Sequence, residues 1–127
     1  MNLVMALAIR SLVPLAHVRS VPASIAFYEK LGFTLGNTFT PPDASEPAWA
    51  WIQSGNAQFM IAKADEPVVP SQQAVLFYLY VDDVAAKYAE LREAGIAGSD
   101  MQYPFYAPRG ELRITDPDGY TLMITHT

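Results

Sequence analysis

The sequence predicts an α+β fold built from two tandem βαβββ units, on the basis of two helices, two tight turns and one constant offset. Two segments, 20–32 and 82–95, carry apolar residues at the spacing i, i+4, i+7 that is typical of a helix with one buried face. Equivalent positions of the two halves lie 63 residues apart. The pairs are Val21 and Val84, Ile25 and Tyr88, Gly32 and Gly95, and Phe59 and Leu122. This offset indicates an internal duplication, in which each unit completes the core of the other.

The first unit is expected over about residues 9–63, as one half of a single domain that spans residues 1–127. Ser20 and Pro22 stand where a helix favours an N-cap and a first-turn proline, and Gly32 is placed to end that helix. The other expected elements are a strand from Ile9 to Val18, a turn at Ser54-Gly55-Asn56 and a strand from Ala57 to Lys63.

A connector of about residues 64–73, with Pro67 and Pro70, leads into the second unit, which is expected over about residues 74–126. Asp82 or Asp83 caps its helix, and Gly95 ends it. The other expected elements are a strand from Ala74 to Val81, a turn at Asp116-Pro117-Asp118-Gly119 and a strand from Tyr120 to Thr125.

Composition restricts the function classes. The chain has 127 residues, a net charge of −5 and no cysteine. The lack of cysteine excludes disulfides, zinc–thiolate sites and thiol catalysis, and the acidic balance argues against nucleic acid as a partner. The apolar run from Leu3 to Ile9 is too short to span a bilayer, and its positive charge follows it, unlike in a signal peptide. We therefore expect a cytoplasmic protein with no membrane partner.

Three motifs together resemble those of one known family. They are the helix Ser24-Ile25-Ala26-Phe27-Tyr28-Glu29-Lys30-Leu31-Gly32-Phe33, the helix entry Val81-Asp82-Asp83-Val84 and the turn Asp116-Pro117-Asp118-Gly119-Tyr120. With the duplication, they resemble the vicinal oxygen chelate superfamily of glyoxalase I, extradiol dioxygenases, fosfomycin-resistance enzymes and bleomycin-resistance proteins. The resemblance extends over roughly Leu12 to Thr125. It implies a curved mixed β-sheet cup with helices on the outer face.

The enzymes of this family hold a divalent metal in the cup through His, Gln or Glu. The resemblance places those ligand positions at Val13, Leu76, Met60 and Met123. Hydrocarbon and thioether side chains cannot hold a hard or borderline divalent ion. We therefore expect no metal, no cofactor and no catalytic residue.

Strand parity predicts what lines the cup instead, because side chains alternate between the two faces of a strand. Phe77, Leu79, Leu112 and Ile114 are expected on the helix side of the sheet. The expected ligand-binding residues, most of them aromatic or sulfur-containing, lie on the other face and in nearby loops: Trp49, Trp51, Met60, Tyr78, Tyr80, Tyr103, Tyr106, Arg109, Glu111, Arg113 and Met123. A mostly apolar concavity with a few polar groups is the usual form of a small-molecule site.

In size, acidity and missing metal ligands the chain is most similar to the bleomycin-resistance proteins. These are dimers whose cups are completed by both chains, and they sequester a cationic, partly planar drug without catalysis. The resemblance implies a non-catalytic homodimer that binds an aromatic or cationic small molecule by stacking and cation–π attraction. The segment Pro108-Arg109-Gly110-Glu111-Leu112-Arg113 lacks a tryptophan that these proteins carry, so the ligand is expected to differ.

Three alternatives stay open at this point. The first is a metal-dependent glyoxalase-like lyase or isomerase, or a dioxygenase, with unorthodox ligands such as His17 and Glu111. The second is a metal-free acid–base enzyme that uses Glu111 with Tyr78 or Tyr80. The third is an interaction module without a small ligand. His17 and His126, the two histidines, are expected to be surface or structural residues.

Overall fold

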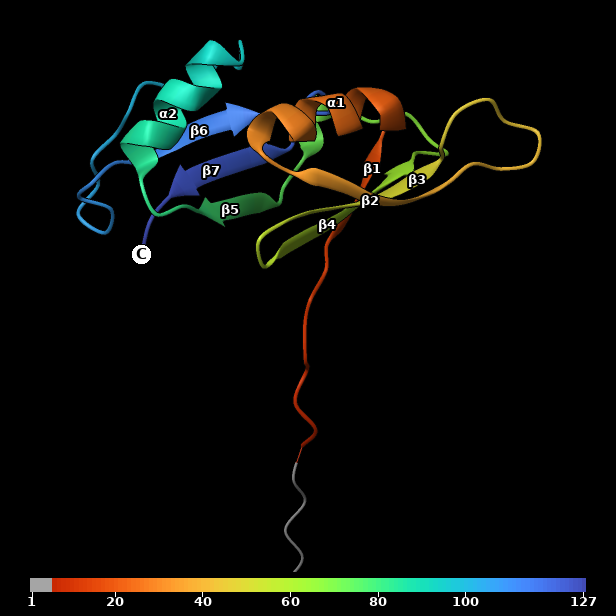
Figure 1. The fold of residues 1–127 in the computed structure, drawn as a ribbon, viewed down its shortest axis with the longest axis horizontal. Helices are drawn as coiled ribbons and strands as arrows, with labels where there is room; N and C mark the ends of the chain where they lie inside the picture. Colours follow the sequence, from red (N-terminus) through yellow and green to blue (C-terminus); the bar gives the residue numbers. More distant parts are fainter. Residues whose placement is uncertain (1–5) are drawn as a thin grey trace, which may run out of the picture.

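A computed structural model describes residues 6–127 and shows two α-helices with two mixed β-sheets (Figure 1). The predicted α+β class is confirmed. The elements of the first half are β1 (Leu15–Val18), α1 (Val21–Leu31), β2 (Thr34–Phe39), β3 (Trp49–Ser54) and β4 (Ala57–Lys63). After a short 3-10 turn at Pro70–Gln72 come β5 (Leu76–Tyr80), α2 (Val84–Glu93), β6 (Leu112–Thr115) and β7 (Thr121–Thr125).

The two sheets share one connectivity, in which the first strand pairs in parallel with the last. The first sheet has the strand order β1-β4-β3-β2, and the second has the order β5-β7-β6. β1 is parallel to β4 and β5 is parallel to β7, while the remaining pairs are antiparallel. A helix follows the first strand in each half, so the duplication predicted from the 63-residue offset is visible in the topology.

Both helices begin and end close to where the sequence predicts. The Ser20 side chain accepts a hydrogen bond from the Ala23 amide at 3.2 Å, and Gly32 follows α1 with a φ of 115°. Asp83, not Asp82, caps α2 by accepting from the Ala86 amide at 2.9 Å. Gly95 adopts a φ of 79°, a left-handed conformation that glycine adopts without steric cost.

The strands differ from the predictions at two places. β1 begins at Leu15, whereas the sequence predicts a strand from Ile9, and Pro14 directly before it has no N–H to donate to a sheet. Residues 3–5 of the apolar run lie outside the described residues. In the second half, the segment equivalent to β2 makes only isolated bridges, from Gly98 to Ile114 and from Gln102 to Glu111. None of the helices in residues 6–127 is long and apolar enough to cross a membrane.

Alternation along the strands separates a packed face from a more open one. Ala50 and Ile52 of β3 are fully buried in the core, whereas Trp49 and Trp51, which alternate with them along the strand, are partly exposed. Leu112 and Ile114 of β6 are buried in the same way, as predicted for the helix side of the sheet. The cores of the two halves join where the rings of Phe59 on β4 and Phe77 on β5 meet edge to face, with centroids 5.2 Å apart.

The turn between β6 and β7 is tied to α1 by two buried carboxylates. The Tyr28 hydroxyl donates to Asp116 at 2.6 Å, and the Ser24 hydroxyl donates to Asp118 at 3.4 Å. The Arg19 amide also donates to Asp118 at 2.8 Å, and the Arg19 guanidinium forms an ion pair with it at 3.1 Å. Burial raises the pKa of Asp116, and burial together with the carboxylate of Asp116 raises the pKa of Tyr28.

We expect the Tyr28→Phe variant to lose about 1–3 kcal/mol of stability at pH 7, because Asp116 keeps its burial but loses a donor. The pH dependence has a definite sign. Folded Tyr28 keeps its proton where an unfolded tyrosine, with an ordinary pKa of 10.0, releases it. The native state then binds more protons, so stability falls as pH rises above about 10.

Urea denaturation at pH 7 and at several values above pH 10 measures both effects. The wild-type chain should lose stability more steeply in the alkaline range than Tyr28→Phe does. Equal stability at pH 7 and parallel alkaline slopes would show that this hydrogen bond contributes nothing to the attachment of the turn.

Candidate functional site

Two aromatic surfaces lie on the predicted cup faces of the sheets, one in each half. On the first sheet, Trp51 pairs with Met60 across β3 and β4, and both are partly exposed. Trp51 packs closely over Gly36 of β2, where an added Cβ would come within 3.2 Å of the indole ring. Trp49 lies two residues away along β3, so it shares this face.

On the second sheet, the rings of Tyr78 and Tyr80 on β5 stack with centroids 6.4 Å apart and planes 28° apart. Their exposed fractions are 45% and 61%. Tyr78 pairs with Met123 of β7, which in turn pairs with Arg113 of β6, so these three residues form one row across the sheet. Arg113 is exposed, and Met123 is buried.

Glu111, directly before β6, is a buried carboxylate at the edge of this surface. Only 5% of the residue is exposed. The Tyr106 hydroxyl donates to its Oε1 at 2.8 Å, and its Oε2 is buried with no hydrogen-bond partner among residues 6–127. The pKa of Tyr106 is raised by this hydrogen bond, and the nearby Tyr78 adds to the shift. Tyr106, Glu111 and Tyr78 therefore belong to one local cluster.

The loop of residues 103–110 carries the remaining predicted ligand-binding residues. Tyr103 is 69% exposed, and its neighbour Phe105 is 96% exposed. The Arg109 amide donates to His126 Nε2 at 3.0 Å, and its guanidinium donates to the Thr127 carbonyl at 3.2 Å. Arg109 and buried His126 thus fix this loop to the end of the chain, which agrees with the structural role expected for His126.

A groove of about 700 Å³ lies between the two halves. One wall is the hairpin Ser54–Ala57, and the other is β5, including Tyr78 and Tyr80. A second cavity of about 300 Å³ continues from it toward Phe59 and Phe77. The tyrosines, unlike the tryptophans, therefore border concave surface within a single chain.

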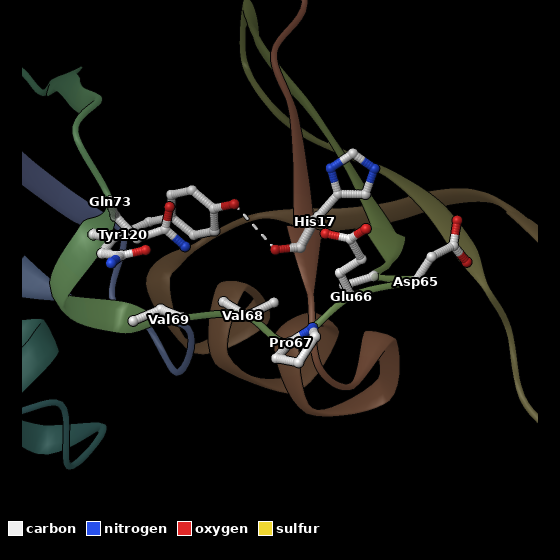
Figure 2. Close-up of a pocket in the computed structure, with 10 residues that line it drawn as sticks. His17, Asp65, Glu66, Pro67, Val68, Val69, Gln73 and Tyr120 are labelled. Atoms are coloured by element: carbon white, nitrogen blue, oxygen red, sulfur yellow. Dashed lines mark hydrogen bonds between the residues drawn. The ribbon is translucent and has the colours of Figure 1, made fainter.

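A separate cavity of about 490 Å³ lies under the connector (Figure 2). His17 of β1, Glu66 and Tyr120 line it, and the Tyr120 hydroxyl donates to the His17 carbonyl at 3.0 Å. None of the predicted ligand-binding residues lines this cavity. His17 therefore stands apart from Glu111, which lies in the second sheet region, so these two residues do not make one metal site.

The positions that the sequence resemblance assigns to the family's metal ligands carry no side chains that fit a metal. Val13 lies just before β1, Met60 is on β4, Leu76 begins β5 and Met123 is on β7. None of these side chains carries an imidazole or carboxylate, the groups that a divalent ion needs here. In addition, residues 6–127 contain no cluster of three or more His, Cys, Asp or Glu side chains arranged to hold a metal.

The described chain brings together only part of the predicted set. Tyr78, Tyr80, Tyr106, Glu111, Arg113 and Met123 gather on the second sheet, while Trp49, Trp51 and Met60 gather on the first. Acid–base catalysis by Glu111 with Tyr78 or Tyr80 would require a hydrogen bond between Glu111 and one of those tyrosines. Within the described residues, Glu111 bonds to Tyr106 instead. Thr125, whose hydroxyl is buried without a partner, is missing from the predicted set. Strand parity placed it on the face of Met123, and this was the available signal.

Comparisons with known proteins now identify the family. A sequence profile of the Glyoxalase/Bleomycin resistance protein/Dioxygenase superfamily matches residues 12–124. The chain belongs to this superfamily. The predicted resemblance is thereby confirmed, and the matched range covers all helices and nearly all strands. The sequence has no significant match among curated proteins.

Solved structures of the superfamily share the fold. A bleomycin-binding protein in complex with bleomycin is similar with a TM-score of 0.74 and 20% identity, over 94% of this chain and 99% of that one. A bleomycin resistance determinant encoded on transposon Tn5 has a TM-score of 0.73 and 20% identity, over 94% of this chain and 98% of its own. The bleomycin-binding protein from Streptomyces verticillus, in complex with copper(II)-bleomycin, has a TM-score of 0.71 and 19% identity, over 96% of this chain and 99% of its own. At these identities the likeness shows the fold alone.

Because the superfamily's metal positions hold apolar residues here, we expect no binding tighter than millimolar when metal-free protein is titrated calorimetrically with zinc, nickel, cobalt or manganese. Micromolar binding at one ion per chain would contradict this placement of the ligand positions. Lyase and dioxygenase assays would then be the next step.

Proposed function

We propose that this chain is a non-catalytic, metal-free member of the superfamily, located in the cytoplasm, that binds an aromatic or cationic small molecule and so sequesters a drug or toxin. The proposal rests on one observation: the expected cup carries apolar and aromatic side chains in place of metal ligands. Residues that cannot coordinate a metal occupy the family's ligand positions, and the same faces carry Trp49, Trp51, Tyr78 and Tyr80.

The chemistry of these faces supports a flat or positively charged ligand. Tryptophan and tyrosine faces attract cations and stack on planar groups, each worth about 0.5–2 kcal/mol. The tyrosines are half-exposed and border the groove of about 700 Å³, which is large enough for a drug-sized molecule. Buried Glu111 supplies negative charge on the same sheet.

A second copy of the chain is part of the proposal. The tryptophan face and the tyrosine face lie on different sheets, and the part of the chain that the structure describes leaves large apolar side chains open to water. They include Leu7, Ile9 and Leu12 at 94%, 85% and 82% exposure. Contact with a second copy would cover such residues. The solved structures that resemble this chain include two bleomycin-binding proteins, which agrees with a small-molecule binder.

A metal-dependent glyoxalase-like lyase or isomerase, or a dioxygenase, is the alternative. The lack of imidazole and carboxylate groups at the expected ligand positions argues against it. Catalysis by Glu111 as a base is also disfavoured. The Tyr106 hydroxyl donates a hydrogen bond to its carboxylate at 2.8 Å, and such a bond stabilises the charged form and makes it a weaker base.

We expect sedimentation equilibrium to give about twice the chain mass of 14.0 kDa at micromolar concentration. Replacing exposed Leu7, Ile9 and Leu12 together by serine should shift the chain toward the monomer, because less apolar area is then removed from water on association. A wild-type chain that stays monomeric at 100-fold higher concentration than the assay would contradict the dimer.

For the binding role, we expect ligands found by a tryptophan-fluorescence screen of bleomycin and aromatic cations to bind the Trp49→Ala, Trp51→Ala double variant at least roughly tenfold more weakly in calorimetry. The matched control, Trp49→Phe with Trp51→Phe, keeps an aromatic face at each position and should retain most of the affinity. Unchanged affinity in the alanine variant would remove the tryptophans from the site.

A further inference from the structure

One row of side chains across the second sheet combines an aromatic ring, a hydroxyl and a carboxylate. Tyr80 of β5 pairs with Thr125 of β7, and β7 pairs with β6 so that Leu112 faces Ile124. Continuing this register by one residue places Glu111 opposite Thr125. Residues in register across a sheet share a face, so the three side chains project from the same face of the second sheet.

Two buried polar atoms in this row lack a hydrogen-bond partner within residues 6–127. Thr125 and Glu111 are 2% and 5% exposed, and neither Thr125 Oγ1 nor Glu111 Oε2 is hydrogen-bonded to any residue of that range. Buried polar groups are almost always hydrogen-bonded, and a buried carboxylate oxygen without a donor is costly. Two such atoms on one face of the sheet favour a ligand that supplies the missing donors.

The surroundings of Glu111 favour a positively charged donor. Tyr106 occupies Oε1 and thereby leaves Oε2 as the free oxygen. The ion pairs within residues 6–127 are Arg19 with Asp118 and Lys87 with Glu90, so Glu111 has no cationic partner in that range. The nearest basic residue along the strand, Arg113, is exposed and belongs to the next row.

We propose that Glu111 and Thr125 bind a protonated primary amino group of the ligand, with the ring of Tyr80 beside it. The inference rests on the proposed function and specifies its ligand class. A primary ammonium has three N–H donors, which match the carboxylate oxygen, the hydroxyl oxygen and the face of an aromatic ring.

This chemistry separates primary amines from other cations. A quaternary ammonium carries the same charge but no N–H, so it would leave both oxygens buried without donors. A neutral alcohol of the same shape offers one donor and no charge. A hydrogen bond to a charged group contributes about 1.5–3 kcal/mol, so discrimination should be at least roughly tenfold.

The first test uses the unaltered chain of residues 1–127 and three matched probes: 2-phenylethylammonium, its N,N,N-trimethyl analogue and 2-phenylethanol. Dissociation constants are measured at pH 7 by following backbone amide shifts in NMR spectra. We expect the primary ammonium to bind at least roughly tenfold more tightly than either analogue, with the largest shifts at Glu111 and Thr125.

Glu111→Gln and Thr125→Val should each reduce that preference, while their melting temperatures stay equal or rise, because the first removes a buried charge and the second removes a buried hydroxyl without a partner in residues 6–127. Two matched substitutions serve as controls. Glu93→Gln changes the same charge on the exposed surface of α2, and Thr121→Val changes the same hydroxyl on the same face of β7.

The outcomes separate the inference from the proposed function. Equal binding of all three probes overturns the amine site but keeps an aromatic binding surface. Equal binding of the two cations, both tighter than the alcohol, also overturns it and leaves cation–π attraction alone. Binding of none of the probes overturns the inference and counts against the proposed function. A large fall in melting temperature for both Glu111→Gln and Thr125→Val assigns the two residues to the fold instead.

Discussion

The attachment of the β6–β7 turn to α1 is the constraint on which the rest of the structure depends. Asp116 and Asp118 are buried in the second half, and every side chain that donates to their carboxylates, from Tyr28, Ser24 and Arg19, comes from the first half. Asp116 also accepts from the amides of its own turn. Buried carboxylates are tolerated only with such donors. The two halves are therefore held in one orientation by bonds that neither could make alone.

This attachment determines which faces remain available for function. It packs α1, β4 and β5 into one core, where the rings of Phe59 and Phe77 are in contact. The helix-side faces of both sheets are therefore buried in this core. The opposite faces keep Trp49, Trp51, Tyr78 and Tyr80 partly or largely exposed. A protein that had no use for these faces would gain solubility by replacing such rings with polar residues.

Sequence reasoning predicted the fold well because the duplication offered each element twice. Both helices, their caps and the hairpin strand Ala57–Lys63 follow from local signals that tertiary packing does not override. The prediction that the first strand begins at Ile9 was wrong, because Pro14 directly precedes the observed start of β1 at Leu15. The expected strand near Gly98 is replaced by isolated bridges. Parity placed Leu112 and Ile114 in the core as predicted. It could not foresee that Tyr106 bonds to Glu111, because that contact depends on how the loop of residues 103–110 folds back.

The central claim is that the chain binds its ligand without transforming it. Mass spectrometry of a ligand from the fluorescence screen, recovered after long incubation with the chain, tests this most directly when run with and without added divalent metal. The account predicts unchanged ligand mass under both conditions, with no more than one ligand molecule retained per chain. Conversion of several ligand molecules per chain under either condition would contradict it and make the protein an enzyme.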